Sequence, residues 1–247
     1  MVKEYSEDFF LSSGETNAEK EMSLPLLVSK LIDIATSHAN SLGIGNPDMK
    51  KESLGWVLAR LTVDMKSYPK VNTRYRITTW VESWNRHFSE RAFCISDAEG
   101  NVFGYARSVW MVLDANSRVN AGLSDLNFNS EMISARECPV ARQQKHIKID
   151  TPPIASYTFQ YCDLDAYRHV NTVRYVVILL NLFPLRMHDT RRVSRLELAF
   201  LHEARYGETV TVHSEEAIED EEGTTTSLYM TTAEHPVLYS RIRFTER

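Results

Sequence analysis

Residues 161–175 have the sequence Tyr161-Cys-Asp-Leu-Asp-Ala-Tyr-Arg-His-Val-Asn-Thr-Val-Arg-Tyr175. The residues from roughly 171 to 183 would be apolar on nearly every side of a helix, which predicts a helix buried on most sides. Asn171 or Thr172 is the expected N-cap of this helix, and Pro184 is expected to end it.

The residues in front of this helix predict a strand, because Tyr157-Thr-Phe-Gln-Tyr161 has aromatic side chains at every second position. The segment therefore joins a strand to a helix N-terminus, where backbone N–H groups have no helical partner. Asp163, Asp165 and His169 lie at this point. Helix N-termini stabilise anions, so the place suits a reaction that builds negative charge on an oxygen, such as thioester hydrolysis.

The chain contains a weak internal repeat. Ser194-Arg-Leu-Glu-Leu198 resembles Ala59-Arg-Leu-Thr-Val63, which lies 135 residues earlier. In each half, a strand-like stretch is followed by one apolar helix and then by several long strands. In the first half, Ser23 is a candidate N-cap and Pro25 falls in the first helical turn.

A long helix wrapped by an antiparallel sheet, formed twice, predicts an α+β protein. We expect an N-terminal domain at residues 1–120 and a C-terminal domain at residues 151–247. Residues 121–150 are poor in aromatic side chains and rich in polar ones, which predicts a surface linker.

The composition excludes several classes of function. A net charge of -5 argues against nucleic acid as the main partner, and no stretch approaches the roughly 20 apolar residues of a membrane span. The acidic N-terminus predicts neither a signal nor a transit peptide. Cys94, Cys138 and Cys162 are few and widely spaced, which favours a reducing compartment. We therefore expect a soluble cytoplasmic protein, and no motif indicates a cofactor or a metal.

The segment resembles the acyl-acyl carrier protein (acyl-ACP) thioesterases, a bacterial and plant-plastid family. The family pattern is similar to Asp-x-Asp-x-Asn-x-His-Val-Asn-Asn-x-x-Tyr, and this chain follows it from Asp163 to Tyr175. Stretches at 55–60, 104–110 and 200–210 also resemble the family, and 181–184 is similar to its bacterial branch. The resemblance implies two tandem hot-dog domains, each a long central helix wrapped by an antiparallel sheet. It also implies hydrolysis of fatty acyl-ACP, which ends fatty acid elongation.

The resemblance assigns roles to three residues. Asp165 corresponds to the family's catalytic aspartate, His169 to its histidine, and Glu203 to a catalytic glutamate on the strand facing the helix. Their expected counterparts in the first half are Asn17, Glu21 and Tyr68. The first half therefore lacks the set, and the resemblance implies that it shapes the acyl pocket.

Two positions depart from the family. Tyr167 stands where the family usually has an asparagine proposed to orient the thioester carbonyl or the attacking water, so activity could be lowered or the role could move to Asn171. Ala204 stands where many plant members have cysteine, so no thiolate nucleophile is expected there. Cys162, next to the site, is expected to be a small core residue.

We hypothesise that Glu203, assisted by His169, activates a water as general base, while Asp165 orients His169 or the substrate. Direct attack by Asp165 or Glu203 through a transient anhydride is the alternative. The candidates for binding the substrate carbonyl or its oxyanion are Tyr167 and the backbone N–H groups of Val170, Asn171 and Thr172.

The expected partner is an acyl carrier protein with a phosphopantetheine-linked fatty acyl chain. Because such carriers are acidic, as this chain is, docking requires a local basic patch. The candidates are Arg186, Arg191, Arg192 and Arg195, or Arg142, Lys145 and Lys148 in the linker. The rival functions are an acyl-CoA thioesterase and a catalytically impaired acyl-binding hot-dog protein. A homodimer is expected by analogy only.

Overall fold

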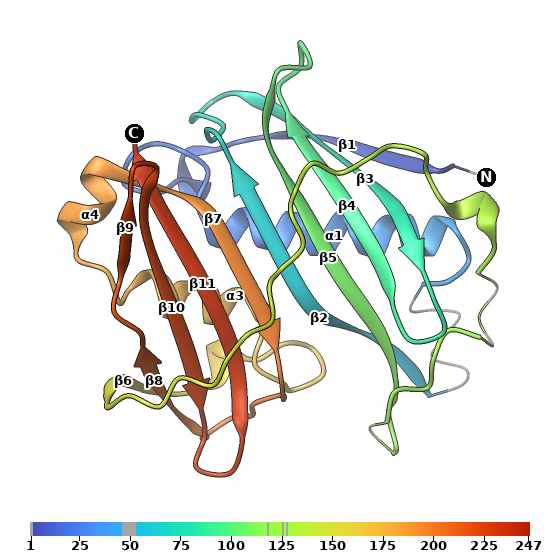
Figure 1. Cartoon of the computed structure of the whole chain (residues 1–247). Coiled ribbons are helices and arrows are strands. Elements are labelled where there is room, and N and C mark those ends of the chain that lie inside the picture. Colours follow the sequence, from blue (N-terminus) through green and yellow to red (C-terminus); the bar gives the residue numbers. More distant parts are fainter. Residues whose placement is uncertain (1, 46–52, 118, 125, 127) are drawn as a thin grey trace. The chain divides into compact units, whose positions relative to one another are not determined.

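The computed structural model describes residues 2–45, 53–117, 119–124, 126 and 128–247. The chain divides into two compact units, Met1–Arg142 and Gln143–Arg247 (Figure 1). Each unit contains an antiparallel sheet and a helix that begins after a short loop. This content agrees with the predicted α+β class.

Unit 1 is a sheet with one long helix. The strands pair in the order β1-β3-β4-β5-β2, and every pairing is antiparallel. The elements are β1 (Glu4–Phe10), η1 (Ser13–Glu15), α1 (Leu24–Ser41), β2 (Leu54–Met65), β3 (Arg74–Trp84), β4 (Ser89–Ser96), β5 (Val102–Asp114) and η3 (Ser130–Met132).

Helix α1 begins where the sequence predicts. The Ser23 hydroxyl accepts a hydrogen bond from the Leu26 backbone N–H at 3.4 Å, and Pro25 lies in the first turn. One face of the helix is buried, including Leu27, Leu31 and Ile34. Because full burial of such a side chain contributes about 1.5–3 kcal/mol, this face is enough to hold the helix against its sheet.

Unit 2 repeats the arrangement with a shorter helix. The strands pair in the order β7-β11-β10-β8-β6, and β9 pairs with β10. The elements are β6 (Pro153–Thr158), η4 (Tyr161–Asp163), α3 (Thr172–Leu180), α4 (Leu185–Thr190), β7 (Arg191–Phe200), β8 (Thr209–Ser214), β9 (Ile218–Asp220), β10 (Gly223–Thr231) and β11 (Pro236–Glu246).

The start of α3 agrees with the prediction, but its end does not. Asn171 is the N-cap, and its side-chain oxygen accepts from the Val173 N–H at 2.9 Å. The helix ends at Leu180, three residues before the predicted end. Pro184 is instead the extended N-cap residue of α4. Since a proline disfavours helical backbone in the residue before it, the chain leaves the helix early and starts a new one after the proline.

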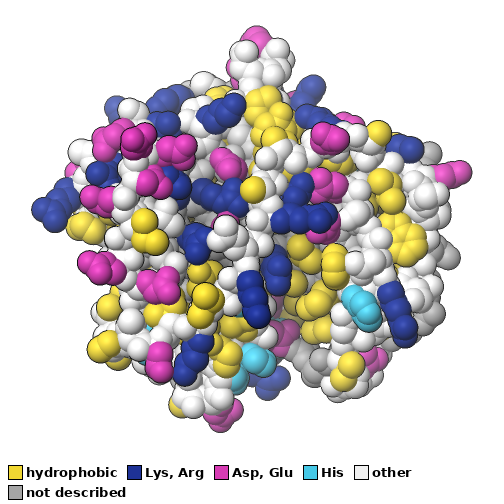
Figure 2. All heavy atoms as spheres, viewed as in Figure 1, with side chains coloured by type: hydrophobic (Ala, Val, Ile, Leu, Met, Phe, Trp, Pro, Cys, Tyr) yellow, Lys and Arg dark blue, Asp and Glu magenta, His cyan; other side chains and the backbone are white. Residues whose placement is uncertain are grey.

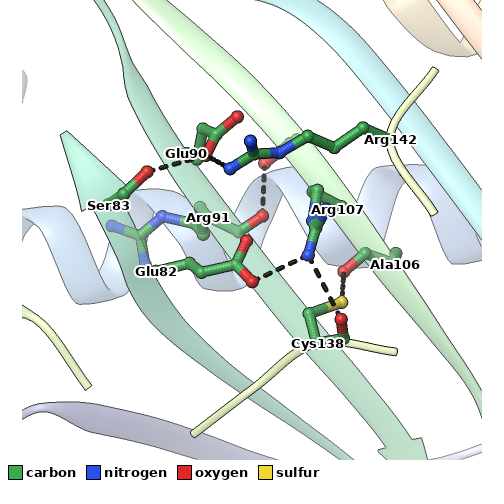
Figure 3. Close-up of polar contacts among 9 residues, drawn as sticks. Glu82, Ser83, Glu90, Arg91, Ala106, Arg107, Cys138 and Arg142 are labelled. Atoms are coloured by element: carbon green, nitrogen blue, oxygen red, sulfur yellow. Dashed lines mark hydrogen bonds and ion pairs between the residues drawn. The ribbon is translucent and has the colours of Figure 1, made fainter. Parts of the chain in front are cut away.

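Parts of the predicted linker lie on the sheet of unit 1. The side chains of Cys138 and Val140 pack with Trp80 on its outer face. Arg142, in the predicted linker, forms an ion pair with Glu90 on β4 at 2.6 Å (Figure 3). A second ion pair joins Arg107 on β5 to Glu82 on β3 at 2.7 Å. Arg107 also donates to the Cys138 backbone oxygen at 3.2 Å.

The stretch after residue 142 lies on unit 2 in the same way. Gln143 donates to the Leu198 backbone oxygen at 3.0 Å, the His146 ring stacks on Tyr239, and Ile149 is buried beside Ala199. The three-part division at residues 1–120, 121–150 and 151–247 stays a prediction.

Acidic and basic side chains are intermixed over much of the visible surface, and Lys and Arg side chains gather down the centre of the view (Figure 2). Within the described ranges, no helix has both the length and the apolar character needed to cross a bilayer.

Candidate active site

The loop between β6 and α3 is held by Asp163. This residue is buried, and its Oδ2 accepts hydrogen bonds from the Tyr157 hydroxyl at 2.9 Å and the Gln160 backbone N–H at 2.7 Å. The first of these hydrogen bonds raises the pKa of Tyr157. Arg174 lies 3.7 Å from the other carboxylate oxygen. Both carboxylate oxygens of Asp163 therefore have contacts that hold the loop in front of α3.

Asp165 builds the tight turn that presents His169. Its Oδ1 accepts from the backbone N–H groups of Tyr167 at 2.8 Å and His169 at 3.0 Å. The backbone closes the turn, since the Asp165 N–H donates to the His169 oxygen at 2.8 Å. Arg168 has a positive φ of 66°, an unfavourable conformation for a residue with a side chain. Asp165 therefore positions His169 through the backbone.

His169 and Glu203 meet side chain to side chain. The imidazole Nε2 lies 3.4 Å from Glu203 Oε2, and the two side chains are 19% and 31% exposed. Glu203 lies in the loop after β7, three residues beyond its last residue, Phe200. The expectation that Glu203 belongs to the strand was therefore wrong.

Backbone contacts tie the two loops together. His169 forms a bridge with Arg205, and the Val170 N–H donates to the Ala204 oxygen at 2.9 Å. The Tyr175 ring, one turn into α3, contacts Phe200 at the end of β7 with ring centroids 5.8 Å apart. The pairing of His169 with Glu203 is thus set by several local contacts.

This arrangement suits general base chemistry. A partly exposed carboxylate beside an imidazole can accept a proton from water and share it with the ring. The distance of 3.4 Å is slightly long for a hydrogen bond, as catalytic contacts often are before substrate binds. Within the described part of the chain, no three His, Cys, Asp or Glu side chains gather as metal ligands do.

The backbone N–H groups at the start of α3 differ in availability. That of Val170 donates to Ala204 and that of Asn171 donates to the Asp163 oxygen at 2.8 Å. The Val173 N–H is taken by the N-cap. In the described structure, the Thr172 N–H has no backbone acceptor. Of the three predicted oxyanion donors, Thr172 is therefore the one that is left free.

Unit 1 contains the same pair of loops. Asn17 Oδ1 accepts from the backbone N–H groups of Glu19 at 3.1 Å and Glu21 at 2.9 Å, as Asp165 does in unit 2. Lys20 has a φ of 61° at the position of Arg168. Glu21 forms a bridge with Lys70, as His169 does with Arg205. These contacts confirm the predicted alignment of the two helix starts.

The chemistry of the unit 1 loops is different. Glu21 replaces the histidine, is 6% exposed and is ion-paired with Lys70. The position of Glu203 is taken by Tyr68, which is also buried. Unit 1 therefore keeps the frame without the histidine–carboxylate pair.

Other residues near the site are exposed. Tyr167 is 61% exposed, and the turn uses its backbone N–H rather than its ring. Cys162 is exposed, so the expectation of a core residue was wrong. It lies in η4, where strand alternation does not apply. Sequence reasoning did not single out Arg168 and Arg205, which flank the pair and are both exposed.

The predicted basic cluster after α3 is spread over two faces of β7. Adjacent strand residues point to opposite faces, so Arg191 and Arg192 diverge. Arg191 lies 3.0 Å from Glu246, and Arg195 lies 2.8 Å from the buried Glu197. Arg186 is exposed on α4. Docking by this cluster stays a prediction.

Two family models match the chain. The model of the acyl-ACP thioesterase N-terminal domain matches residues 2–125, and the model of the C-terminal domain matches residues 147–245. A palmitoyl-acyl carrier protein thioesterase of Gossypium hirsutum is 27% identical over 218 residues, which are 81% of this chain. The chain spans about half the length of the curated relatives it matches, 52% for this one.

Solved structures agree over almost the whole chain. An acyl-ACP thioesterase from Bacteroides thetaiotaomicron superposes with a TM-score of 0.85 at 27% identity and covers 98% of both chains. The 12:0-ACP thioesterase from Umbellularia californica gives a TM-score of 0.82 at 18% identity, covers 99% of this chain and 94% of that one, and supports the fold alone. The predicted hot-dog fold is confirmed by these similarities.

Proposed function

Because the chain belongs to the acyl-ACP thioesterase family, we propose that it hydrolyses fatty acyl-ACP thioesters to free fatty acid and ACP, which ends fatty acid elongation. The observation that supports this most directly is the contact of His169 with Glu203 at 3.4 Å, on loops whose unit 1 counterparts lack both groups. A pure binding protein gives no reason for that difference between two otherwise matching loops.

The proposed mechanism assigns each group one task. Glu203, assisted by His169, accepts a proton from a water whose oxygen attacks the thioester carbonyl carbon. The carbon–sulfur bond breaks, and the proton that Glu203 took from water passes through His169 to the departing thiolate. The Thr172 N–H and the α3 N-terminus stabilise the oxyanion. Asp165 holds His169 by its backbone. Direct attack by Asp165 or Glu203 through an anhydride is the alternative, although the turn contacts of Asp165 make it the less available nucleophile.

We propose that the two units are domains with the same fold. Residues 1–120 and 151–247 form tandem hot-dog domains with α1 and α3 as their central helices, and residues 121–150 connect them. The N-terminal domain shapes the acyl pocket, and the C-terminal domain is catalytic. We place the protein in the cytoplasm of a bacterial cell, acting on carrier-bound chains, and a homodimer remains the analogy-based proposal.

A second candidate function rests on one observation. Tyr167 stands at a position where the family pattern has asparagine, and its side chain is 61% exposed. A protein that has lost that amide could bind acyl chains without releasing the thiol. The remaining rival is an acyl-CoA thioesterase. It differs from the proposed enzyme by preferring CoA-bound to carrier-bound substrates.

The test is release of free thiol from carrier proteins loaded with acyl chains of different length, alongside the matching CoA esters. Turnover that favours the carrier-bound set supports the proposal and gives the chain-length preference. Binding without turnover on every member supports the second candidate, and restored turnover in Tyr167→Asn would then identify the cause. Equal or better turnover on CoA esters would replace the proposed substrate.

A further inference from the structure

The loops that hold His169 and Glu203 expose large aromatic side chains. Tyr161 is 81% exposed, Tyr167 61% and Tyr206 63%. All three lie within eight residues of the histidine or three residues of the glutamate along the chain. Tyrosine at a surface position offers a large contact area with little rotamer freedom to lose, and it is enriched in protein–protein interfaces.

Two arginines on the same loops lack an acidic partner. Arg168 and Arg205 are exposed, and neither guanidinium makes an ion pair with a described residue. Other arginines of unit 2 are paired: Arg174 with Asp163, and Arg243 with Asp220 and Glu222. The charges of Arg168 and Arg205 are therefore available to a partner.

The acidic side chains of these loops are less exposed than the two arginines. Asp163 holds the loop, Asp165 Oδ1 accepts two backbone N–H groups, and Glu203 faces His169. Glu208 is half-buried, and it accepts from the Arg205 backbone N–H at 2.7 Å. Arg168 and Arg205 are therefore the exposed ionic side chains of residues 161–171 and 201–208, so a partner meets positive charge first, although the whole chain has a net charge of -5.

The loops of unit 1 provide an internal comparison. The counterparts of the five surface residues Tyr161, Tyr167, Arg168, Arg205 and Tyr206 are Ser13, Glu19, Lys20, Lys70 and Val71. Lys70 is neutralised by the buried Glu21, and no tyrosine is present among the five. The aromatic and basic surface therefore occurs in the copy that has the histidine–carboxylate pair and not in the other.

Backbone strain also marks Arg168. Its φ of 66° is easiest for glycine or asparagine, yet a long basic side chain stands there. Lys20 has the same feature at a φ of 61°. The left-handed conformation is therefore a property of the duplicated turn, and both copies have a basic residue there.

We propose that Arg168 and Arg205, with Tyr161, Tyr167 and Tyr206, form the docking surface for an acidic carrier protein, which we call the loop rim. The inference rests on the proposed function, because the carrier delivers its thioester between the two loops. The arginines attract acidic side chains of the carrier, and the tyrosines supply the area that excludes water. The rim lies beside the reacting groups, so docking and delivery of the acyl chain are one event.

The experiment measures binding of a holo carrier protein, bearing the phosphopantetheine arm without an acyl chain, to four proteins. These are the wild type, Arg168→Glu/Arg205→Glu, the matched unit 1 control Lys20→Glu, and Arg191→Glu/Arg192→Glu. Anisotropy of a labelled carrier at low and high salt gives each Kd, and thermal melting confirms that every variant folds.

We expect the rim variant to bind at least about tenfold more weakly and to lose most of its salt dependence, with Lys20→Glu within about twofold of the wild type. A carrier with lysines in place of its acidic residues should bind the rim variant better than the natural carrier does. Unchanged binding of the rim variant overturns the proposal, and so does a larger loss in Arg191→Glu/Arg192→Glu.

Kinetics add a second readout. For the rim variant, kcat/KM should fall at least about fivefold more on an acyl carrier than on an acyl-N-acetylcysteamine thioester, which has no protein to dock. Equal losses on both substrates would mean that the arginines serve the reaction rather than docking, and would overturn the proposal. Wild-type protein that binds the carrier but releases no thiol would refute the proposed hydrolysis and leave the docking result standing.

Discussion

The Nε2 atom of His169 lies 3.4 Å from Glu203 Oε2, and the backbones of their loops are joined between Val170 and Ala204 at 2.9 Å. The pair is thus fixed by two short loops that the fold duplicates. The chemical difference between the copies lies in the side chains, since unit 1 presents Glu21 and Tyr68 on the same frame. Because the loop backbone is shared and the side chains differ, the contribution of each side chain can be tested by a substitution that keeps the loop.

Replacement of Glu203 by glutamine should abolish most hydrolysis. The amide keeps the shape of the side chain but cannot accept a proton from water, and loss of a general base costs about 10²–10⁴ in rate. The measurement is kcat for thiol release from an acyl carrier, with carrier binding measured in parallel and expected to persist. Glu234→Gln, on the exposed turn between β10 and β11, is the control and should behave as wild type. Near-normal kcat in Glu203→Gln would remove this residue from the mechanism.

Substitutions of Asp165 should separate its structural task from its charge. In unit 1, the Asn17 amide oxygen accepts the same two backbone N–H groups, at 3.1 and 2.9 Å. Asp165→Asn should therefore retain the turn and the melting temperature, while loss of the negative charge near His169 lowers kcat. Asp165→Ala should lose both, with a destabilisation of roughly 1–2 kcal/mol from two unsatisfied N–H groups. An asparagine variant as unstable as the alanine variant would contradict this division.

Unit 1 should lose stability in mild acid because of His38. This histidine is fully buried, and burial, with the neighbouring Arg91, lowers its pKa to about 4. Its Nδ1 lies 2.7 Å from the Arg91 guanidinium and its Nε2 lies 2.9 Å from the Val2 oxygen, so both nitrogens are engaged in the neutral form.

The sign follows from where the proton binds. Below about pH 6.5 the unfolded chain protonates His38, but the folded protein does so only near pH 4. Stability should therefore fall as the pH drops between these values, by up to about 3 kcal/mol from this group. The measurement is the free energy of unfolding in urea across that range for the wild type and for His38→Gln, which stays neutral. The difference between the two proteins should change with pH, and a constant difference would contradict the assignment.

Local hydrogen-bonding chemistry made the site loops predictable. Asn171 caps α3 and the 17–21 turn matches the 165–169 turn because these contacts depend on residues four or fewer positions apart. The alignment of Glu203 with Tyr68 followed from the repeat of 135 residues. Fold class could thus be predicted from spacing, whereas the catalytic candidates came from the family resemblance and stay a prediction.

Features that depend on tertiary contacts were not predictable. The divergence of Arg191 from Arg192 depends on the register of β7 with β11, and the paired state of Arg195 depends on the burial of Glu197. The early end of α3 came from a proline that starts the next helix instead of ending the previous one. The exposure of Arg168 and Arg205 beside less exposed carboxylates depends on how the two loops fold.

A glycine at the start of β10 should be irreplaceable for a steric reason. Gly223 has a φ of 148°, and a Cβ there would lie 2.0 Å from the Phe244 backbone oxygen in the adjacent strand β11. Gly223→Ala must push the two strands apart, so it should destabilise the protein by roughly 1–3 kcal/mol. The matched control is Gly14→Ala, where nothing lies within 4 Å of the added carbon and the change should be within about 0.5 kcal/mol. Urea midpoints of the two variants give the comparison. Equal midpoints for the two alanine variants would show that β10 and β11 separate there without a measurable loss of stability.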